Sequence, residues 1–433
     1  MFRKIGLAMA LASALAMGTA VSVAQEIKDV RMWTFLNAQG TSPREVALAQ
    51  IIKDFEAANP DIRITVETQV FDQMTPKFLA AHSAGNAPDI IWALTDFLGD
   101  AINSGSLADL RPEFMSDWTP EQVADRAGGY WDLCEIDGKH YCLFTSRNYI
   151  SIVYRKDLLA EAGIDPATLT TWEAFRAAAE KLTVKDANGN VVRYGFGQGF
   201  SEKQADPPVL VPMMLATQGA LFDANGKAQF ATPEGVAAVT YVVEMIKAGV
   251  MPEQSVNWTV DDVYEQFAAD RLAMIQGASV RVSTLQSKVG ADNVGLMLFP
   301  GPSADIPHSP AVMTGWAVGV WSGSKAKSEA ARFVDYMLGE ESDSVWVTVG
   351  GQSPGLQSTV AKASDFFGVP ANDYLTVAAE GSANYGWLAP IDYSIGGFRE
   401  ILSKVVQNVV VNGTDPMVAL QDAEADFNQR HGR

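Results

Sequence analysis

The sequence predicts an α/β fold built from more than one domain-sized unit. Apolar runs typical of strands alternate with amphipathic segments that begin at helix-capping residues, from residue 30 almost to the C-terminus. A chain of 433 residues, 48% of them hydrophobic and 19% charged, is ordinary for a globular protein with sizeable cores. No repeat, low-complexity tract or long Gly/Ser linker interrupts the alternation. We therefore expect several crossovers of the chain to join the units.

The N-terminal segment predicts a signal peptide at residues 1–24. Arg3 and Lys4 precede an apolar run over 5–17, and small residues lead to Ala24, after which we expect cleavage. The run is too short to span a bilayer, although an uncleaved N-terminal anchor is the alternative. We therefore expect the mature protein to be exported across the inner membrane and released into the periplasm.

The first unit opens with a strand–helix–strand–helix–strand pattern. Ser42-Pro43-Arg44-Glu45 has the form of a capping box with proline at the first helical position, and Asn59-Pro60 ends the same helix. The expected elements are, in order, strand 30–36, helix 43–58, strand 62–66, helix 75–84 and strand 89–92. This order implies a sheet with helices on both faces.

A second α/β region begins with an apolar strand over 148–154. Thr170-Thr171-Trp172-Glu173 and Thr232-Pro233-Glu234 are the starts of two further helices. The remaining elements expected are strands 273–276 and 294–299, a third alternation from 314 with a helix over 326–338, and a final helix over 415–428.

The charge balance excludes several classes of partner. Lys and Arg total 32 against 51 Asp and Glu, which gives a net charge of −19. Such an acidic surface repels phosphate backbones and anionic lipids, so we expect no nucleic-acid or membrane-surface partner. The 4 histidines lie far apart in the sequence, and 2 cysteines cannot form a Cys-rich zinc module. We expect no metal and no cofactor.

The two cysteines predict a disulfide. Cys134 and Cys142 flank Asp137-Gly138, a strong hairpin signal, and a three-residue loop centred on Gly138 would place them opposite each other. In an oxidising compartment the pair should close and contribute roughly 2–3 kcal/mol on the chain-entropy model. Two free buried thiols are the alternative.

Short motifs in a fixed order carry a family resemblance. They are Asp54-Phe55-Glu56 with Asn59-Pro60, and those at 85–91, 104–110, 137–139, 154–158, 171–173, 267–274 and 330–333. Each is weak alone, but together the set resembles the extracellular solute-binding proteins of bacterial carbohydrate ABC importers, the maltose-binding-protein-like family. The resemblance covers nearly the whole mature chain.

The resemblance implies a two-lobed periplasmic binding protein fold with a ligand cleft between the lobes. Three hinge crossovers are expected near 146–152, 311–316 and 349–354. The N-terminal lobe would comprise 25–147 plus 315–349, and the C-terminal lobe 148–314 plus 350–433. Such a protein is a monomeric component of an ABC transporter, which binds a mono- or oligosaccharide and delivers it to the membrane permease subunits. The alternatives are a glycerol phosphodiester, a sugar acid or another polar solute in the same fold.

Polar candidates for ligand binding follow from the resemblance and from sugar chemistry. A pyranose has a rim of hydroxyl groups, which need directional hydrogen-bond partners. Asp96, just past a strand end, matches a sugar-contacting carboxylate of the family, although a charge at a helix start is the alternative. Asn148 matches a polar contact at the first hinge, while Arg147 beside it departs from the pattern. Arg147 would contact a hydroxyl or an acidic sugar, or else form a surface ion pair.

Aromatic candidates follow from the apolar face of a pyranose, which packs on flat rings. They are Trp33 and Phe35 at the end of the first strand, Trp92 in the third, Trp258 in a loop, Trp316 beside Gly315 at the second hinge, and Trp387. Core packing is the alternative for Trp92 and Trp387.

The segment after Gly277 departs from the family pattern. Many relatives carry a tryptophan there, whereas this chain has Ala278-Ser279-Val280-Arg281. A maltodextrin ligand is therefore in doubt. Ser279 and Arg281 are polar candidates in its place.

The sequence contains one candidate catalytic motif, and this motif does not support an enzymatic function. Gly351-Gln352-Ser353-Pro354-Gly355 has the spacing of a nucleophile elbow, but Pro354 lacks the backbone N–H that an oxyanion hole requires. A secreted glycosidase with two carboxylates is the less favoured alternative, because no sequence motif is diagnostic of one.

Overall fold

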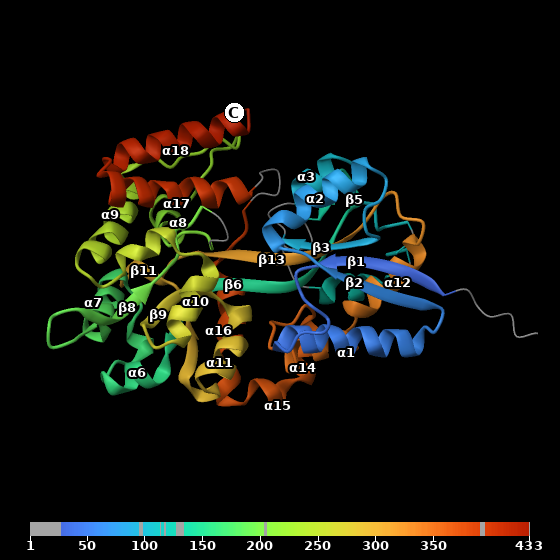
Figure 1. Ribbon diagram of the computed structural model, residues 1–433, viewed down its shortest axis with the longest axis horizontal. Helices are drawn as coiled ribbons and strands as arrows, with labels where there is room; N and C mark the ends of the chain where they lie inside the picture. The colour runs from blue at the N-terminus through green and yellow to red at the C-terminus, as the bar shows by residue number, and fades with distance from the viewer. Residues whose placement is uncertain are drawn as a thin grey trace, which may run out of the picture.

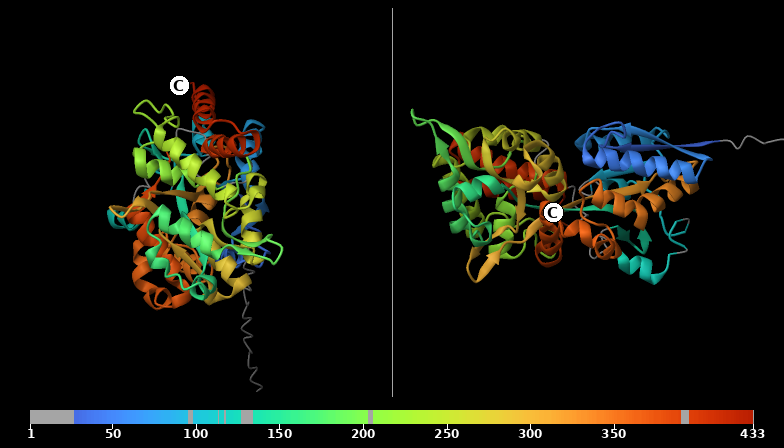
Figure 2. Two further views of the ribbon diagram at one scale, coloured as in Figure 1. Left: turned by 90° about the vertical axis from the view of Figure 1, so that its left-hand side faces the viewer. Right: turned by 90° about the horizontal axis from the view of Figure 1, so that it is seen from below.

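The computed structural model describes residues 27–94, 98–112, 114–116, 118–126, 134–202, 206–389 and 395–432. Two lobes lie side by side along the long axis (Figure 1), and a view from below separates the same two lobes (Figure 2). Each lobe has its own hydrophobic core, as the two-lobed α/β prediction requires. The predicted signal peptide, with Ala24 at its end, lies outside the described residues.

The N-terminal lobe contains the predicted strand–helix–strand–helix–strand unit. Its first elements are β1 (Lys28–Thr34), α1 (Pro43–Ala58), β2 (Ile62–Thr68), α2 (Phe71–Ser83), β3 (Ile90–Leu94), α3 (Leu98–Asn103) and α4 (Pro120–Asp125). Strand β1 pairs in parallel with both β2 and β3. Two later helices, α12 (Lys327–Met337) and α13 (Glu340–Thr348), complete this lobe by packing on α1.

Helix α2 is longer than the sequence predicted. It begins at Phe71 instead of Thr75, so that Pro76 lies inside the helix. Proline there costs one backbone hydrogen bond, but Met74 and Phe78 on the same helix are fully buried in the core. Burial of these side chains outweighs the local preference to start at the proline.

The C-terminal lobe is the larger one, and its sheet is covered by many helices. Its elements up to residue 308 are α6 (Lys156–Glu161), α7 (Trp172–Leu182), β7 (Val184–Lys185), β8 (Val191–Gly197), α8 (Leu210–Gln218), α9 (Pro233–Lys247), α10 (Val260–Ala268), β9 (Leu272–Ala278), α11 (Val282–Val289), β10 (Val294–Met297), β11 (Pro300–Ser303) and β12 (Ile306–His308). The chain returns to this lobe with α16 (Asp373–Tyr385), β14 (Gly386–Trp387), α17 (Ile395–Asn412) and α18 (Pro416–Arg430). Helices α17 and α18 pack together on its outer side (Figure 1).

Two long strands run from one lobe into the other. They are β6 (Leu143–Arg155) and β13 (Ala311–Val320), which pair antiparallel in a sheet ordered β2-β1-β3-β13-β6-β9-β8-β7. On β6, Leu143 belongs to the N-terminal core and Tyr149 to the C-terminal core. The first crossover therefore lies between these two residues, and the second lies on β13 between Met313 and Trp316 by the same criterion. These intervals overlap the expected crossovers near 146–152 and 311–316, and a hinge role for the two strands stays a prediction.

The third connection leaves the N-terminal lobe later than residue 349. The Asp343 carboxylate on α13 accepts hydrogen bonds from the backbone N–H groups of Gly355 and Leu356, at 2.8 and 3.1 Å. Helix α14 (Gln357–Lys362) follows. In its first turn, the backbone N–H and the hydroxyl of Ser358 both donate to the Asp125 carboxylate of α4. After α15 (Ser364–Phe367), α16 packs on strands of the C-terminal lobe. These contacts tie residues 355–358 to the N-terminal lobe, whereas the Tyr374 hydroxyl of α16 donates to the Gly351 carbonyl at 2.9 Å. The segment over 351–358 therefore contacts both lobes, and the exact bounds of the lobes stay a prediction.

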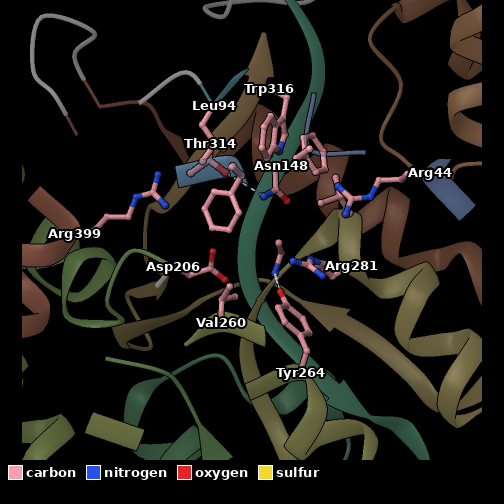
Figure 3. Close-up of a pocket in the computed structure, with 14 residues that line it drawn as sticks. Arg44, Leu94, Asn148, Asp206, Val260, Tyr264, Arg281, Thr314, Trp316 and Arg399 are labelled. Atoms are coloured by element: carbon pink, nitrogen blue, oxygen red, sulfur yellow. Dashed lines mark hydrogen bonds between the residues drawn. The ribbon is translucent and has the colours of Figure 1, made fainter. Parts of the chain in front are cut away.

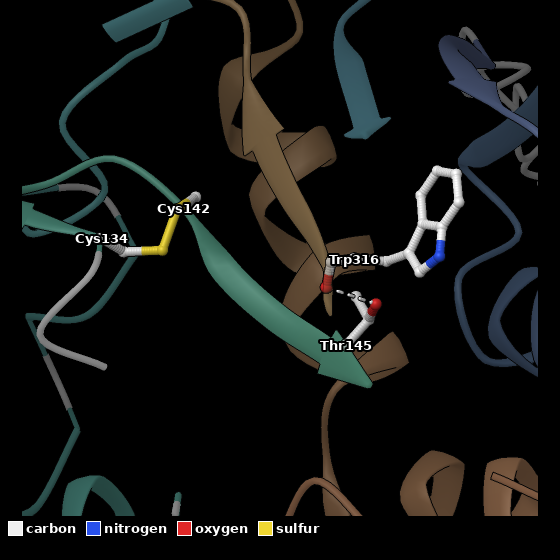
Figure 4. The surroundings of a disulfide bond; sticks show 4 residues. All are labelled: Cys134, Cys142, Thr145 and Trp316. Carbon is white, nitrogen blue, oxygen red and sulfur yellow. Dashed lines mark hydrogen bonds between the residues drawn. A yellow bond between two sulfur atoms is a disulfide. The ribbon is translucent and has the colours of Figure 1, made fainter. Parts of the chain in front are cut away.

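The hairpin before β6 holds the predicted disulfide. Strands β4 (Glu135–Ile136) and β5 (Lys139–His140) pair antiparallel, and Cys134 is bonded to Cys142 with their Cα atoms 5.1 Å apart (Figure 4). The loop is a two-residue Asp137-Gly138 turn with positive φ at both residues, not the expected three-residue loop. The backbone N–H of Tyr141 donates to the Cys134 carbonyl, so the disulfide closes one residue beyond the hairpin ladder.

None of the described helices is both long enough and apolar enough to cross a membrane.

Candidate functional site

A cavity lies where the two lobes meet the two connecting strands. It has a volume of about 580 Å³, part of which is open to solvent. Fourteen described residues line it (Figure 3): Phe35, Arg44, Phe71 and Leu94 from the N-terminal lobe, Asn148, Thr314 and Trp316 from β6 and β13, and Asp206, Val260, Tyr264, Ala278, Val280, Arg281 and Arg399 from the C-terminal lobe.

The ends of strands place several of these side chains. Phe35 directly follows β1, and Leu94 is the last residue of the neighbouring parallel strand β3. On the other lobe, Ala278 ends β9, and Arg281 lies in the short helical turn that follows. Ligands in open α/β sheets bind outside the carboxyl ends of the strands, and the cavity occupies that place in both lobes.

Aromatic rings form one wall of the cavity. The rings of Phe35 and Trp316 stack with centroids 3.6 Å apart and planes inclined by 27°. Phe71 meets Trp316 edge-on at 6.4 Å. Trp316 itself is only 8% exposed, so its orientation is fixed by packing. This wall offers a flat apolar surface to a ligand.

Fixed polar groups lie on the connecting strands. The Asn148 side chain is 6% exposed, and its Nδ2 donates to Thr314 Oγ1 at 3.0 Å across the β6–β13 pair. Ser279 Oγ lies 3.5 Å from Asn148 Oδ1 and accepts the backbone N–H of Tyr149 at 3.2 Å. The amide of Asn148 is therefore held in one orientation at the cavity surface.

Asp206 supplies a carboxylate to the C-terminal wall. Burial raises the pKa of this carboxyl to about 6, against the opposing effect of the positive charge on Arg281. Its Oδ2 is buried and has no hydrogen-bond partner in the described part of the chain. Nearby, Tyr264 Oη accepts the Ala278 N–H at 2.6 Å, and burial raises the pKa of Tyr264. Asp206 is thus a strong acceptor with unused capacity.

Three arginines also line the cavity. Arg281 Nη2 forms an ion pair with Asp261 Oδ1 at 3.0 Å, and its guanidinium lies 5.2 Å from the centroid of the Tyr264 ring. The Arg44 guanidinium lies 5.2 Å from the centroid of Phe35. Burial, followed by the charge of Arg281, lowers the pKa of Arg44 to about 9, and burial lowers the pKa of Arg399 to about 10.

Four of the predicted ligand-binding residues line the cavity: Phe35, Asn148, Arg281 and Trp316. Ser279 is buried behind Asn148 and orients it. Asp96 lies outside the described residues. Arg147 lies on β6 opposite Gly315 of β13, but its side chain is also outside the described part.

The structure places five other predicted residues away from the lining. Trp92 is 1% exposed in the N-terminal core, where its Nε1 donates to Thr145 Oγ1 at 2.6 Å. Trp33 Nε1 donates to Glu67 Oε2 at 2.7 Å on the β1–β2 surface. Trp258 and Trp387 pack on the C-terminal core.

The fifth of them, Gly315, pairs with Arg147 within the sheet and is not among the lining residues.

Sequence reasoning missed Arg44, Asp206, Tyr264 and Arg399. Arg44 lies in the first turn of α1, inside a motif that was used only to locate the helix. Asp206 and Arg399 come from segments far apart in the sequence, which only the tertiary fold brings together. For Arg44 the available signal was a basic residue in the first turn of a helix, where cations are disfavoured.

Within the described part of the chain, no group of three or more His, Cys, Asp or Glu side chains could hold a metal ion. The lining itself supplies amide, carboxylate, guanidinium and aromatic groups, which are suited to hydrogen bonding and stacking.

The sequence pattern of the bacterial extracellular solute-binding proteins matches residues 40–343, well over half of the chain. The protein belongs to this family. A Brucella abortus relative named as a binding protein is 24% identical over 414 residues, 94% of each chain.

Solved structures of similar fold support the assignment of the fold. An ABC substrate-binding protein of Listeria monocytogenes in complex with cycloalternan superposes with a TM-score of 0.78 and 21% identity, over 94% of this chain and 100% of that one. A Thermotoga lettingae ABC transporter solute-binding protein with bound α-D-tagatose has a TM-score of 0.79 and 22% identity, over 93% and 99%. In this chain, both lobes contribute lining residues to the cavity between them.

Proposed function

We propose that this solute-binding protein is the periplasmic receptor of a carbohydrate ABC importer. It binds a mono- or oligosaccharide in the cavity between its lobes and delivers it, as a monomer, to the membrane permease. The observation that carries the proposal is the lining itself: an aromatic wall at Phe35 and Trp316 faces a polar wall with Asp206. A pyranose needs both a flat apolar surface and hydrogen-bond partners for its hydroxyls.

The positions of the lining residues support hinge closure. The N-terminal lobe contributes Phe35 and Phe71, the C-terminal lobe contributes Asp206 and Tyr264, and two continuous strands join them. A sugar that contacts both walls stabilises the closed arrangement over the open one by its differential affinity for the two. The permease would then recognise the closed receptor.

The carboxylate content of the cavity lining supports a binding role without catalysis. Glycosidases use a pair of carboxylates on either side of the scissile bond, whereas Asp206 is the one carboxylate among the described lining residues. The relatives with bound cycloalternan and tagatose have the same fold and are named as substrate-binding or solute-binding proteins.

A thermal-shift screen of the mature protein against a panel of mono- and oligosaccharides tests the proposal. A ligand at ~100 Kd should add about 2.7 kcal/mol to the free energy of unfolding, which moves the melting temperature measurably. Chromatography after long incubation should recover the sugar intact. The proposal fails if no carbohydrate stabilises the protein, and hydrolysis of a bound sugar would favour the enzyme instead.

A further inference from the structure

The cavity is rich in positive charge in a protein that is strongly acidic. The chain carries a net charge of −19, yet its described cavity lining contains three arginines against one carboxylate, Asp206. Neutral sugars need hydrogen-bond donors, but uncharged side chains provide these without the cost of bringing cations together in a partly buried space. The charge therefore calls for an explanation beyond sugar binding in general.

Arg44 occupies an unfavourable position for a cation. It is the second residue of α1, at the end of the helix where the macrodipole favours negative charge. The adjacent Glu45 does not neutralise it by an ion pair, because the Glu45 carboxylate accepts hydrogen bonds from Ser42 and from the N–H of Asn37. In the described part of the chain Arg44 makes no ion pair, and its buried Nε has no hydrogen-bond partner.

Arg281 brings a second cation to the same side of the cavity from the opposite lobe. Figure 3 shows the guanidinium groups of Arg44 and Arg281 on one side of the cavity, above and beside Tyr264. The charge of Arg281 is the second-largest cause, after burial, of the lowered pKa of Arg44. Asp261 pairs with only one nitrogen of Arg281, so the rest of that guanidinium is available to the cavity.

We propose that the bound sugar carries an acidic group, a carboxylate or a phosphate, and that this group is held between Arg44 of the N-terminal lobe and Arg281 of the C-terminal lobe. This inference rests on the proposed function of the same cavity. A guanidinium donates two parallel hydrogen bonds to a carboxylate or phosphate, a geometry that suits such a group better than a hydroxyl. The anion relieves the repulsion between two cations on opposing lobes, so it favours closure directly.

Calorimetric titration of the mature full-length protein with matched sugar pairs tests the inference. The probes are galacturonate against galactose, glucuronate against glucose, the corresponding di- and trisaccharides, and glucose 6-phosphate. We expect the acidic member of a pair to bind roughly 10- to 100-fold more tightly than its neutral counterpart, because charge-assisted hydrogen bonds replace neutral ones. The uronates and the sugar phosphate distinguish the two kinds of anion. The preference should also weaken as salt is raised.

Variants of the two arginines locate the effect. Arg44→Gln and Arg281→Gln should each lower the ratio of acidic to neutral affinity by roughly tenfold or more, and Arg44→Lys should lower it less, since charge is kept and the planar fork is lost. Arg176→Gln is the matched control, because Arg176 pairs with Glu180 and Glu244 on the outer surface of α7. It should leave the ratio unchanged. The ligand-free melting temperature of Arg44→Gln should change little, since no ion pair is lost and the contact removed is that of the guanidinium with the Phe35 ring.

Two results would overturn the inference. One is a neutral sugar that binds as tightly as its acid, in which case the proposed sugar function stands and only the acidic group is wrong. The other is an acid preference that persists in both glutamine variants. If neither neutral nor acidic sugars bind, the proposed function fails as well.

Discussion

The two walls of the cavity differ in chemistry. The N-terminal wall is mainly aromatic, with Phe35, Phe71 and Trp316, and the C-terminal wall is mainly polar, with Asp206 and the ion-paired Arg281. One wall fits the apolar face of a sugar and the other its hydroxyl rim. Neither lobe alone provides both kinds of lining residue, so the proposed binding requires β6 and β13 to hold the two walls together. Because the two walls differ in chemistry, we expect variants on the aromatic wall and variants on the polar wall to weaken binding in different ways.

Removing the aromatic wall should have the largest effect. Trp316→Ala deletes the ring that stacks on Phe35, and we expect affinity for the sugar found in the panel to fall roughly 100-fold. The free energy of unfolding should also fall, by about 3–5 kcal/mol, because the side chain is buried. Calorimetry and denaturant unfolding measure the two effects.

Trp346→Phe separates stability from binding. Trp346 is buried in the N-terminal core away from the cavity lining, and its Nε1 donates to the Met337 carbonyl at 3.1 Å. Its loss should destabilise the protein by about 1–3 kcal/mol while leaving the affinity unchanged. If, by contrast, Trp316→Ala keeps the wild-type affinity, the sugar does not contact the aromatic wall.

The polar wall should respond to pH as well as to substitution. Asp206→Asn keeps one acceptor and should weaken sugar binding about tenfold. The pKa of Asp206 is about 6 when folded against 3.8 ordinarily, so the folded state binds more protons between these values. Stability due to this group is therefore lost as the pH rises from about 4 to above 6.

Asp206→Asn should remove that loss. Its ligand-free free energy of unfolding should exceed that of the wild type at pH 7.5, by at most about 3 kcal/mol, and match it near pH 3.5. Thermal unfolding at the two pH values measures this. If the variant and the wild type differ in free energy of unfolding by the same amount at both pH values, ionisation of the Asp206 carboxyl does not destabilise the folded protein.

The disulfide hairpin provides a contrast to both walls. Its cysteines are fully buried in the N-terminal core and do not line the cavity. The double variant Cys134→Ser with Cys142→Ser should lose roughly 2–3 kcal/mol of stability and little affinity. Thiol titration of the denatured wild type before reduction should find no free thiol. A loss of affinity matching the loss of stability would tie the hairpin to the site.

The sequence predicted the fold better than the site, for a physical reason. Helix caps such as Ser42-Pro43 and alternating strands such as 62–66 act locally, so α1 and β2 were found where they occur. The start of α2 was misplaced because burial of Met74 and Phe78 overrides the local effect of proline.

Strand position alone could not separate ligand contacts from core residues. Trp92 and Trp316 both lie on strands with buried residues on both faces, yet one ring is in the core and the other lines the cavity. Phe35 and Asn148 were predicted because strand ends and hinges are where this fold binds ligands; both line the cavity, and their contact with a ligand stays a prediction. Arg399 on α17 was not, because no local pattern shows which helix ends face the other lobe.

Small-angle scattering tests the central claim, that a sugar bound between the two walls draws the lobes together. The radius of gyration of the mature protein should be measured with and without a sugar whose binding is saturated by calorimetry. The account predicts a smaller radius with sugar, and no change for Trp316→Ala at the same sugar concentration if that concentration lies below the variant's Kd. An unchanged radius for the saturated wild type would contradict it.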